Sequence, residues 1–206
     1  MSAAFGLPLV LDGSAVRALV VGGGTVAARK AAALRQGGAS VRIRAPEVNR
    51  ELASRSERDE HLLIEQRAYD SAAIGDATLV VVATDDPVVN ARVADDARRA
   101  GSLTIVADEP ALGNCVMPAV HRSGELVVAV TSGGVPGASV RVRDALARRL
   151  DGRYATAIRE LARLRQRLLR ERDRTRWRAA ARALIADDFC ESVETGAFEE
   201  RLTQWR

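Results

Sequence analysis

The stretch VRALVVGGGTVAARKAAAL, residues 16–34, joins an apolar run, three consecutive glycines and an alanine-rich segment. Residues 16–21 are mostly β-branched or apolar, which favours a buried strand, whereas the alanines favour a helix. Gly22, Gly24 and Ala27 therefore fit the pattern G-x-G-x-x-[GA] directly after a strand and directly before a helix.

The small residues of this turn suit the binding of a phosphate. Gly22 permits a tight turn, Gly24 leaves no Cβ between the backbone and a pyrophosphate, and Ala27 lets the helix pack closely on the sheet. Free N–H groups at the start of the helix face the anion. We therefore predict a dinucleotide site in which Gly22, Gly24, Thr25 and Val26 hold the phosphates and the nearby ribose, although three glycines alone also fit an ordinary turn.

The acid that usually completes such a site is absent. A dinucleotide-binding strand commonly ends in Asp or Glu about 20 residues after the glycines, where the acid holds the ribose hydroxyls. Here the strand ends in IRAPE, with Arg44 at that position. An arginine accommodates a 2′-phosphate, so both NAD and NADP stay open. We expect Arg44, Pro46 and Glu47 to border the adenosine side.

The first half of the chain alternates strands with helices, which predicts a parallel sheet with helical crossovers. Strands are expected at residues 16–21, 40–45, 61–66, 78–83 and 102–107, and helices from near Thr25, Val48, Ala72 and Pro87. A further strand is expected within residues 125–134. From Ser139 onward the pattern is helical, with a leucine-rich stripe from Leu146 to Leu168. The fold class is therefore α/β, a Rossmann-like sheet followed by a helical region.

Composition limits the location and the metal chemistry. The 206 residues are 47% hydrophobic and 28% charged, as in an ordinary globular protein. The sequence contains no apolar run near the ~20 residues that cross a bilayer. The start, MSAAFGLPLVLDG, lacks the features of a signal peptide. We expect a cytoplasmic protein without membrane association, with Cys115 and Cys190 reduced and no structural metal.

Charge is distributed unevenly along the chain. Residues 141–182 hold fifteen arginines and five acids, whereas residues 187–200 hold six acids and no base. This asymmetry suggests a polyanionic partner or an oligomer joined by complementary charge. A solvated, arginine-rich helix face in a protein encoded by a high-GC genome would have the same composition.

The glycine turn and three further segments carry a family resemblance. The glycine turn, VVATDDPVVN (81–90), VADEPALGNCVMPAV (106–120) and VAVTSGG (128–134) follow one another in order. Together they resemble the precorrin-2 dehydrogenase family, which includes bifunctional precorrin-2 dehydrogenase/sirohydrochlorin ferrochelatases and the N-terminal part of siroheme synthase. The resemblance is clear over residues 8–150 and looser in the helical tail.

The resemblance implies an architecture and a reaction. It implies an NAD-binding Rossmann domain at residues 1–113, a dimerisation and substrate region at 114–150 and a helical C-terminal domain at 151–206. Members oxidise precorrin-2 to sirohydrochlorin with NAD⁺, and some then insert Fe²⁺. The resemblance therefore implies a homodimer with a tetrapyrrole substrate, and it leaves iron insertion open. Because residue 206 follows the last expected helix, we expect no fused methyltransferase domain.

The resemblance also implies roles for particular residues. The family's important aspartate falls on Asp108, just after a predicted strand, where a carboxylate can accept a proton; a cap or turn former before EP is the alternative. Thr84 is expected to contact the cofactor. Asp86 is expected to cap the next helix, and Asn90 either has a function or packs its amide against that loop. Expected substrate contacts are Asn114, Ser132, Gly133 and Arg141, although a plain turn explains the serine and glycine equally well.

Some positions depart from the family pattern. Ile105 stands where the family commonly has Asn, and VPGASVR replaces a run with S-P and L-A-R. These changes concern substrate handling more than the fold. His61 and His121 are expected to be structural or surface imidazoles rather than metal ligands. The rival function is a dinucleotide-sensing regulator that binds nucleic acid through its basic helices, but no helix-turn-helix pattern supports it.

Overall fold

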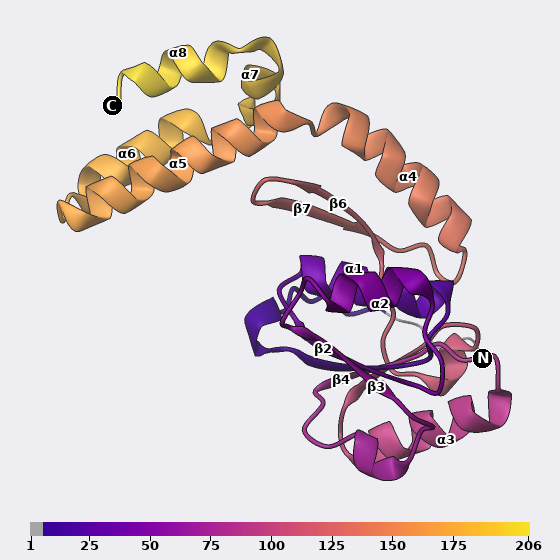
Figure 1. Ribbon diagram of the computed structural model, residues 1–206. Coiled ribbons are helices and arrows are strands. Elements are labelled where there is room, and N and C mark those ends of the chain that lie inside the picture. Colours follow the sequence, from indigo (N-terminus) through magenta and orange to yellow (C-terminus); the bar gives the residue numbers. More distant parts are fainter. Residues whose placement is uncertain (1–5) are drawn as a thin grey trace. The chain divides into compact units, whose positions relative to one another are not determined.

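The computed structural model describes residues 6–206, which form two compact units (Figure 1). The first unit ends at Met117 and the second is Pro118–Arg206. The division lies close to the predicted boundary between residues 113 and 114. The structure places residues 118–150 in one unit with the C-terminal helices, so the predicted separation at residue 150 remains a prediction.

The first unit is built on a five-stranded sheet with the order β3-β2-β1-β4-β5. Its strands are β1 (Arg17–Val21), β2 (Ser40–Ala45), β3 (Leu62–Gln66), β4 (Leu79–Val82) and β5 (Leu103–Val106). All four neighbouring pairs are parallel. The predicted Rossmann-like fold is therefore confirmed, and all five expected strands are present.

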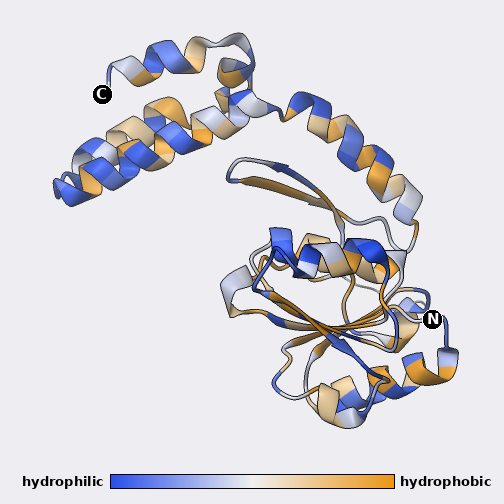
Figure 2. Ribbon diagram, viewed as in Figure 1, coloured by the Kyte–Doolittle hydropathy of each residue, from blue (hydrophilic) through white to orange (hydrophobic). Residues whose placement is uncertain are grey.

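Helices bury both faces of this sheet (Figure 1). Helices α1 (Thr25–Gln36) and α2 (Arg50–Ser56) cover one face, and α3 (Pro87–Arg99) covers the other. Successive residues of β1 alternate between the two cores, with Val20 in one and Val21 in the other. A strand buried on both faces needs apolar residues at nearly every position, which explains the continuous apolar runs of the sequence and the orange strands of Figure 2.

The helix expected from Ala72 is absent. The connection from β3 to β4 contains only a short 3-10 turn, η2 (Ser71–Ala73). Gly75, at φ +50°, follows this turn and does not continue a right-handed helix. Ala73 and Ile74 still pack into the core beside α3, so the segment supplies the apolar contacts of a crossover helix without forming one.

The second unit combines a hairpin with five helices among the described residues. Strands β6 (Ala119–Ser123) and β7 (Leu126–Val130) pair antiparallel. The helices are α4 (Pro136–Arg149), α5 (Gly152–Arg170), α6 (Arg174–Leu184), α7 (Phe189–Thr195) and α8 (Ala197–Thr203). Short 3-10 turns also form in the first unit, at η1 (Gly13–Ala15) and η3 (Pro110–Leu112).

The helical pattern of the C-terminal sequence is confirmed with one change. The expected stripe from Leu146 to Leu168 is interrupted between α4 and α5, where Asp151 caps α5 by accepting the N–H of Arg153. Tyr154, Leu164 and other buried side chains of α5 form the core of the helical part with α6, α7 and α8. Strand β6 was not expected, because the half-buried sequence AVHRS has little apolar alternation.

Candidate dinucleotide-binding site

The glycine turn directly follows β1, and Gly22 has a backbone conformation that only glycine adopts readily. Its φ is +127°, and a Cβ there would lie 2.1 Å from the carbonyl oxygen of Ala83, just after β4. The N–H of Gly22 donates to the carbonyl oxygen of Arg44 at 3.0 Å. The first glycine therefore brings together the carboxyl ends of β1, β2 and β4.

Gly23 makes the closest approach in the turn, and the sequence prediction missed it. A Cβ on Gly23 would lie 1.8 Å from the carbonyl oxygen of Glu47. The carbonyl oxygen of Gly23 accepts the N–H of Asn49 at 2.9 Å. Pro46 and Glu47 are exposed and lie in this loop beside the turn, and their contact with the adenosine side remains a prediction. The motif leaves its second position variable, so the only available signal was that the middle residue of the triplet is also a glycine.

Gly24 faces open space at the start of α1. No atom lies within 4 Å of the Cβ position of Gly24. Gly24 is the N-cap of α1, no side chain caps the helix, and its first turn holds no acid. The backbone N–H groups of the first helical turn, including those of Thr25 and Val26, have no partner within the helix and attract an anion.

Helix α3, which starts at the same edge of the sheet, differs in this respect. Asp86 caps it by accepting the N–H groups of Val88 and Val89 at 2.8 and 3.2 Å, as predicted. A carboxylate already occupies this helix end, so α1 rather than α3 offers the anion site. The uncapped helix and the open Cβ position of Gly24 fit the diphosphate of a dinucleotide.

Thr84 lies at the end of β4, next to the glycine turn. Its hydroxyl donates to the amide oxygen of Asn90 at 2.6 Å, and the amide nitrogen of Asn90 donates to the carbonyl oxygen of Thr84 at 3.0 Å. Asn90 is buried, so its amide braces this loop, which was one of the two expectations for it. The predicted contact of Thr84 with the cofactor remains a prediction.

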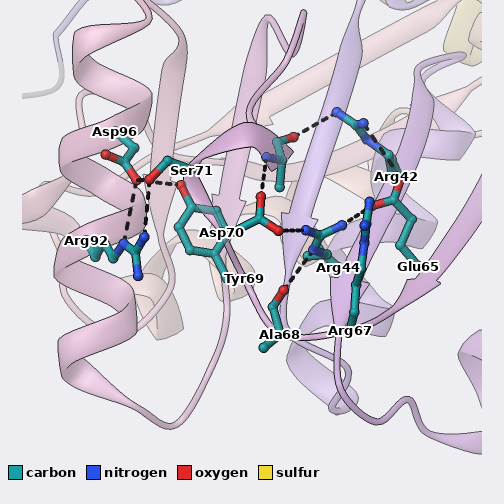
Figure 3. A network of polar contacts seen from close by, with 11 residues as sticks. Arg42, Arg44, Glu65, Arg67, Ala68, Tyr69, Asp70, Ser71, Arg92 and Asp96 are labelled. Atoms are coloured by element: carbon teal, nitrogen blue, oxygen red, sulfur yellow. Dashed lines mark hydrogen bonds and ion pairs between the residues drawn. The ribbon is translucent and has the colours of Figure 1, made fainter.

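Arg44 has a different environment from the one that we expected. Its side chain is only 1% exposed. Its Nε donates to the carbonyl oxygen of Ala68 at 3.0 Å, its Nη1 donates to Glu65 at 2.5 Å, and its Nη2 donates to Asp70 (Figure 3). Each guanidinium nitrogen is already engaged, so the group is not free for a 2′-phosphate in this arrangement. The hydrogen bond of Arg44 to the glycine turn comes from its backbone, where its carbonyl oxygen accepts the N–H of Gly22.

Two acids in this region, Glu65 and Asp96, have pKa values below their usual range. Burial acts to raise the pKa of Glu65, but the hydrogen bond from Arg44 and the charge of Arg42 outweigh it and hold this pKa below its usual range. On α3, hydrogen bonds from Ser71 and Tyr69 lower the pKa of Asp96 against a smaller effect of burial. These contacts fasten the segment after β3 to β2 on one side and to α3 on the other (Figure 3).

Asp108 lies at the same edge of the sheet, two residues after β5. Asp108 is exposed. The backbone N–H of the residue before it, Ala107, donates to the carbonyl oxygen of Val82 at the end of β4. The N-cap of η3 is Glu109, and no side chain caps that turn, so Asp108 does not have the alternative capping role. Ile105 is buried in the core and offers no polar group at this position.

Asn114, predicted to contact substrate, pairs with the edge of β5. Its side-chain oxygen accepts the N–H of Thr104 at 2.7 Å, and its side-chain nitrogen donates to the carbonyl oxygen of Ser102 at 3.3 Å. Its backbone N–H donates to the carbonyl oxygen of Thr104. The amide therefore acts as a partner for an edge strand, a role that no sequence signal indicated.

The remaining predicted substrate residues belong to the second unit. The hydroxyl of Ser132 lies 2.7 Å from that of Ser139 and donates to the carbonyl oxygen of Val135 at 2.5 Å. Gly133 has a φ of +58°, which suits a turn, and Arg141 is exposed on α4. Their contact with substrate remains a prediction.

The histidines and the other metal-binding side chains offer little for a metal ion. The Nε2 of His121 lies 2.8 Å from the carbonyl oxygen of Leu150, and His61 is exposed. Residues 6–206 bring together no group of three or more His, Cys, Asp and Glu side chains suited to a metal ion. Within the same range, no helix is both long enough and apolar enough to span a membrane.

Comparison with known proteins agrees with this geometry. A family model described as "Putative NAD(P)-binding" matches residues 9–119. The siroheme synthase of Saccharophagus degradans is 37% identical over 162 residues, which are 78% of this chain and 35% of that protein. The siroheme synthase of Nitrosococcus oceani is 35% identical over 200 residues, which are 95% of this chain and 40% of that protein. The chain thus spans two fifths or less of the length of these two relatives.

A solved structure matches almost the whole chain. The protein named "SirC, precorrin-2 dehydrogenase" superposes with a TM-score of 0.76 at 25% identity, covering 96% of this chain and 99% of the other. The match includes both the sheet and the helical part. The chain therefore belongs to the NAD(P)-binding family that the matching model describes, and the resemblance to precorrin-2 dehydrogenases is confirmed.

Proposed function

We propose that this protein is an NAD⁺-dependent precorrin-2 dehydrogenase that forms sirohydrochlorin in siroheme biosynthesis. The observation that carries the proposal is the match to SirC over nearly the full length of both chains. The uncapped α1, with an open position at Gly24, supports the dinucleotide half of the reaction. The exposed carboxylate of Asp108, at the same edge of the sheet, supports the proton-transfer half.

The chain's own groups supply binding and proton transfer. Bound NAD⁺ would accept the hydride removed from the macrocycle. The N–H groups of Thr25 and Val26 hold its diphosphate, because the start of α1 is positive and unoccupied by protein groups. Thr84 and the loop of Pro46 and Glu47 lie at the same edge of the sheet and are the other proposed cofactor contacts.

Asp108 is the proposed base. Loss of a hydride from one C–H bond of the macrocycle and of a proton from another atom leaves a new double bond. The proton passes to the Asp108 carboxylate and then to water. A carboxylate that takes a proton in the transition state contributes about 10²–10⁴-fold to the rate.

The Asp108→Ala variant tests this role, with Glu109→Ala as its matched control. Glu109 is the adjacent exposed carboxylate and caps nothing through its side chain. Asp108→Ala should bind NAD⁺ normally in a calorimetric titration and lose at least about 10²-fold in turnover. Glu109→Ala should keep turnover. Equal turnover of the two variants would remove Asp108 from the mechanism.

The proposed substrate, precorrin-2, is a polyanion. Each ring of precorrin-2 carries an acetate and a propionate, and guanidinium groups bind carboxylates bidentately. Arg141 is exposed, whereas Arg143 already contacts Asp144 at 2.7 Å, so Arg141 is the proposed carboxylate ligand. Ser132 and Gly133 are the other proposed substrate contacts of this unit, whereas the side chain of Asn114, predicted as a contact from the sequence, already pairs with β5.

The proposed assembly is a homodimer, for which apolar side chains on the second unit provide support. Val135, Val140 and Val142 of α4 and its N-cap are 40–58% exposed, and Val127 of β7 is 38% exposed. A second copy covering these residues would remove them from water. The proposed location is the cytoplasm, which keeps thiols such as Cys115 and Cys190 reduced.

One assay tests the whole proposal. The purified protein is incubated with NAD⁺ and enzymatically generated precorrin-2, and the absorbance of sirohydrochlorin is followed. A rate proportional to protein concentration is the expected result. Absence of turnover together with salt-sensitive binding of duplex DNA would support the nucleic-acid-binding alternative instead. Fe²⁺ added afterwards, with spontaneous insertion measured in parallel, tests whether the protein also inserts iron.

A further inference from the structure

The end of β2 is the position where dinucleotide folds distinguish NAD from NADP. An acid there binds the ribose hydroxyls of NAD, whereas an arginine nearby accommodates the 2′-phosphate of NADP. Arg44 occupies this position twenty residues after Gly24. Its carbonyl oxygen accepts the N–H of Gly22, so it lies directly beside the glycine turn. Judged from the sequence alone, this arginine leaves both NAD and NADP open.

The tertiary structure withdraws this cation from the surface. The Arg44 side chain is 1% exposed and is held by Glu65 and Asp70. Glu65 is its neighbour on β3 in the parallel register. Asp70 comes from the segment after β3 and also accepts the N–H of Ala73 at 3.2 Å through its other oxygen. Two carboxylates therefore hold the buried guanidinium of Arg44, and both remain partly exposed, at 28% and 52%.

The neighbouring cations do not restore a phosphate site. Arg42 donates to the carbonyl oxygen of Ala73 at 2.8 Å and lies 3.8 Å from Glu65. Arg67 is 65% exposed and lies 3.4 Å from the same carboxylate. Both cations thus face Glu65, and the exposed charge of Arg67 is screened by solvent. Arg67 is nevertheless the nearest alternative ligand for a phosphate, so the experiment includes it.

A second group of contacts fixes the segment that carries Asp70. Tyr69 and Ser71 donate to one carboxylate oxygen of Asp96 on α3, at 2.9 and 2.8 Å (Figure 3). The residues on both sides of Asp70 are therefore anchored to a helix. Releasing Arg44 toward a ligand would require breaking its hydrogen bonds to Glu65, Asp70 and Ala68 and moving a side chain that is now only 1% exposed, which is unfavourable.

We propose that Arg44, Glu65 and Asp70 form a selectivity element that makes the site prefer NAD⁺ over NADP⁺. The guanidinium at the strand end is unavailable, and a 2′-phosphate would instead approach the carboxylates of Glu65 and Asp70. The ribose hydroxyls of NAD⁺ meet no such repulsion. The inference rests on the proposed dinucleotide site and concerns only which dinucleotide that site accepts.

Calorimetric titration of the full chain with NAD⁺ and with NADP⁺ tests the element directly. The dissociation constant of the wild type for NADP⁺ should exceed that for NAD⁺ by about 100-fold, because like charges brought into contact are strongly unfavourable. Equal affinities would overturn the proposal without any variant. Binding of neither dinucleotide would overturn the dinucleotide site itself, which distinguishes the two failures.

The double variant Glu65→Gln/Asp70→Asn tests the mechanism. It keeps hydrogen-bond acceptors around Arg44 but removes both negative charges, so the ratio of the two dissociation constants should fall at least about tenfold. Asp96→Asn is the matched control, since it removes a carboxylate that anchors the same segment without touching Arg44, and its ratio should stay at the wild-type value. Thermal unfolding of each variant verifies that it is folded.

Two further results would contradict the proposal. A folded double variant with an unchanged ratio would show that these carboxylates do not exclude the phosphate. A shift of the ratio in Arg67→Gln as large as that expected of the double variant would place the discrimination on the exposed arginine instead.

Discussion

At the scale of single residues, three adjacent glycines serve three different purposes. Gly22 adopts a left-handed φ against Ala83, Gly23 lies in contact with the carbonyl of Glu47, and Gly24 faces open space. The first two glycines are required by the protein itself. The third is required only if another molecule approaches the backbone. Gly22 and Gly23 therefore serve the fold, and Gly24 serves binding.

Alanine substitutions at Gly23 and Gly24 should therefore affect different properties: stability at Gly23 and NAD⁺ binding at Gly24. Gly23→Ala must displace the loop of Glu47 and should lower the free energy of unfolding by roughly 1–3 kcal/mol. Gly24→Ala should change this free energy by less than about 1 kcal/mol, because the N-cap remains extended and uncrowded, yet it should weaken NAD⁺ binding. Chemical denaturation and calorimetric titration measure the two quantities. Tight NAD⁺ binding by Gly24→Ala would show that the diphosphate does not approach this backbone.

At the scale of elements, polar side chains complete two structures that backbone pairing leaves unfinished. Strand β5 is the edge of the sheet, and Asn114 occupies its free side as a partner strand would. The segment Tyr69–Ser71 has no neighbouring strand and is fastened to α3 through Asp96. Each device satisfies polar groups that would otherwise face the core or an open sheet edge.

Asn114→Ala should expose the edge of β5. Loss of the hydrogen bonds to Thr104 and Ser102 should lower the free energy of unfolding by about 1–2 kcal/mol and increase aggregation on heating. Denaturation curves and light scattering measure both effects. Steady-state kinetics with precorrin-2 separates this role from substrate binding, since a rise in KM with unchanged stability would indicate direct contact with substrate.

Asp96 should make the stability of the first unit depend on pH. Hydrogen bonds from Ser71 and Tyr69 lower its pKa in the folded protein, so its stabilising contribution is complete above the unfolded value near 4 and is lost as the pH falls through the folded value. Asp96→Asn should therefore destabilise the protein by roughly 1–2 kcal/mol at pH 7, and the gap to wild type should narrow in acid.

The matched control for this pH effect is Asp95→Asn. Asp95 lies on the same helix but is 43% exposed and pairs only with Arg98 and Arg99 at the surface. Its replacement should change the free energy of unfolding by less than about 1 kcal/mol at either pH. Denaturant titrations at pH 7 and at low pH provide the comparison, and a gap for Asp96→Asn that widens in acid would contradict the assigned cause.

At the scale of the whole molecule, two units each have their own hydrophobic core. The sheet of the first unit is buried between two apolar clusters, and the helices of the second unit close around Tyr154, Leu168 and Leu184. The amphipathic helices of the second unit show this division as orange and blue faces in Figure 2. Every residue of the candidate dinucleotide site belongs to the first unit.

Leu168→Ala should separate the stability of the helical core from cofactor binding. Leu168 is fully buried, so its truncation should lower the free energy of unfolding of the second unit by about 2–5 kcal/mol. The dissociation constant for NAD⁺ should not change. Ile185→Ala, at a half-exposed position, should have a much smaller effect on stability. A large loss of NAD⁺ affinity in folded Leu168→Ala would show that the second unit contributes to the cofactor site.

The sequence by itself determined the features that depend on neighbouring residues. Alternating apolar runs specify buried strands, the glycine triplet specifies a turn before α1, and Asp86 followed by Pro87 specifies the start of α3. Each of these requires interactions within a few residues, so the pattern and the structure agree. The helix expected at Ala72 failed because apolar spacing alone does not distinguish a helix from a short turn packed on the same core.

Only the tertiary structure decided which of the polar residues are free to bind. Arg44 is separated by 21 and 26 residues from the carboxylates that hold it, and Asn114 by ten from the strand residue that it caps. Arg44 was predicted to border the cofactor from its position at a strand end, and Asn114 to contact substrate from the family resemblance; neither signal reveals a partner that is distant in the sequence. Parallel pairing and loop docking bring distant acids and backbone groups within hydrogen-bond distance of Arg44 and Asn114. The N-terminus of α1 and Asp108 stay among the groups that are open to ligands.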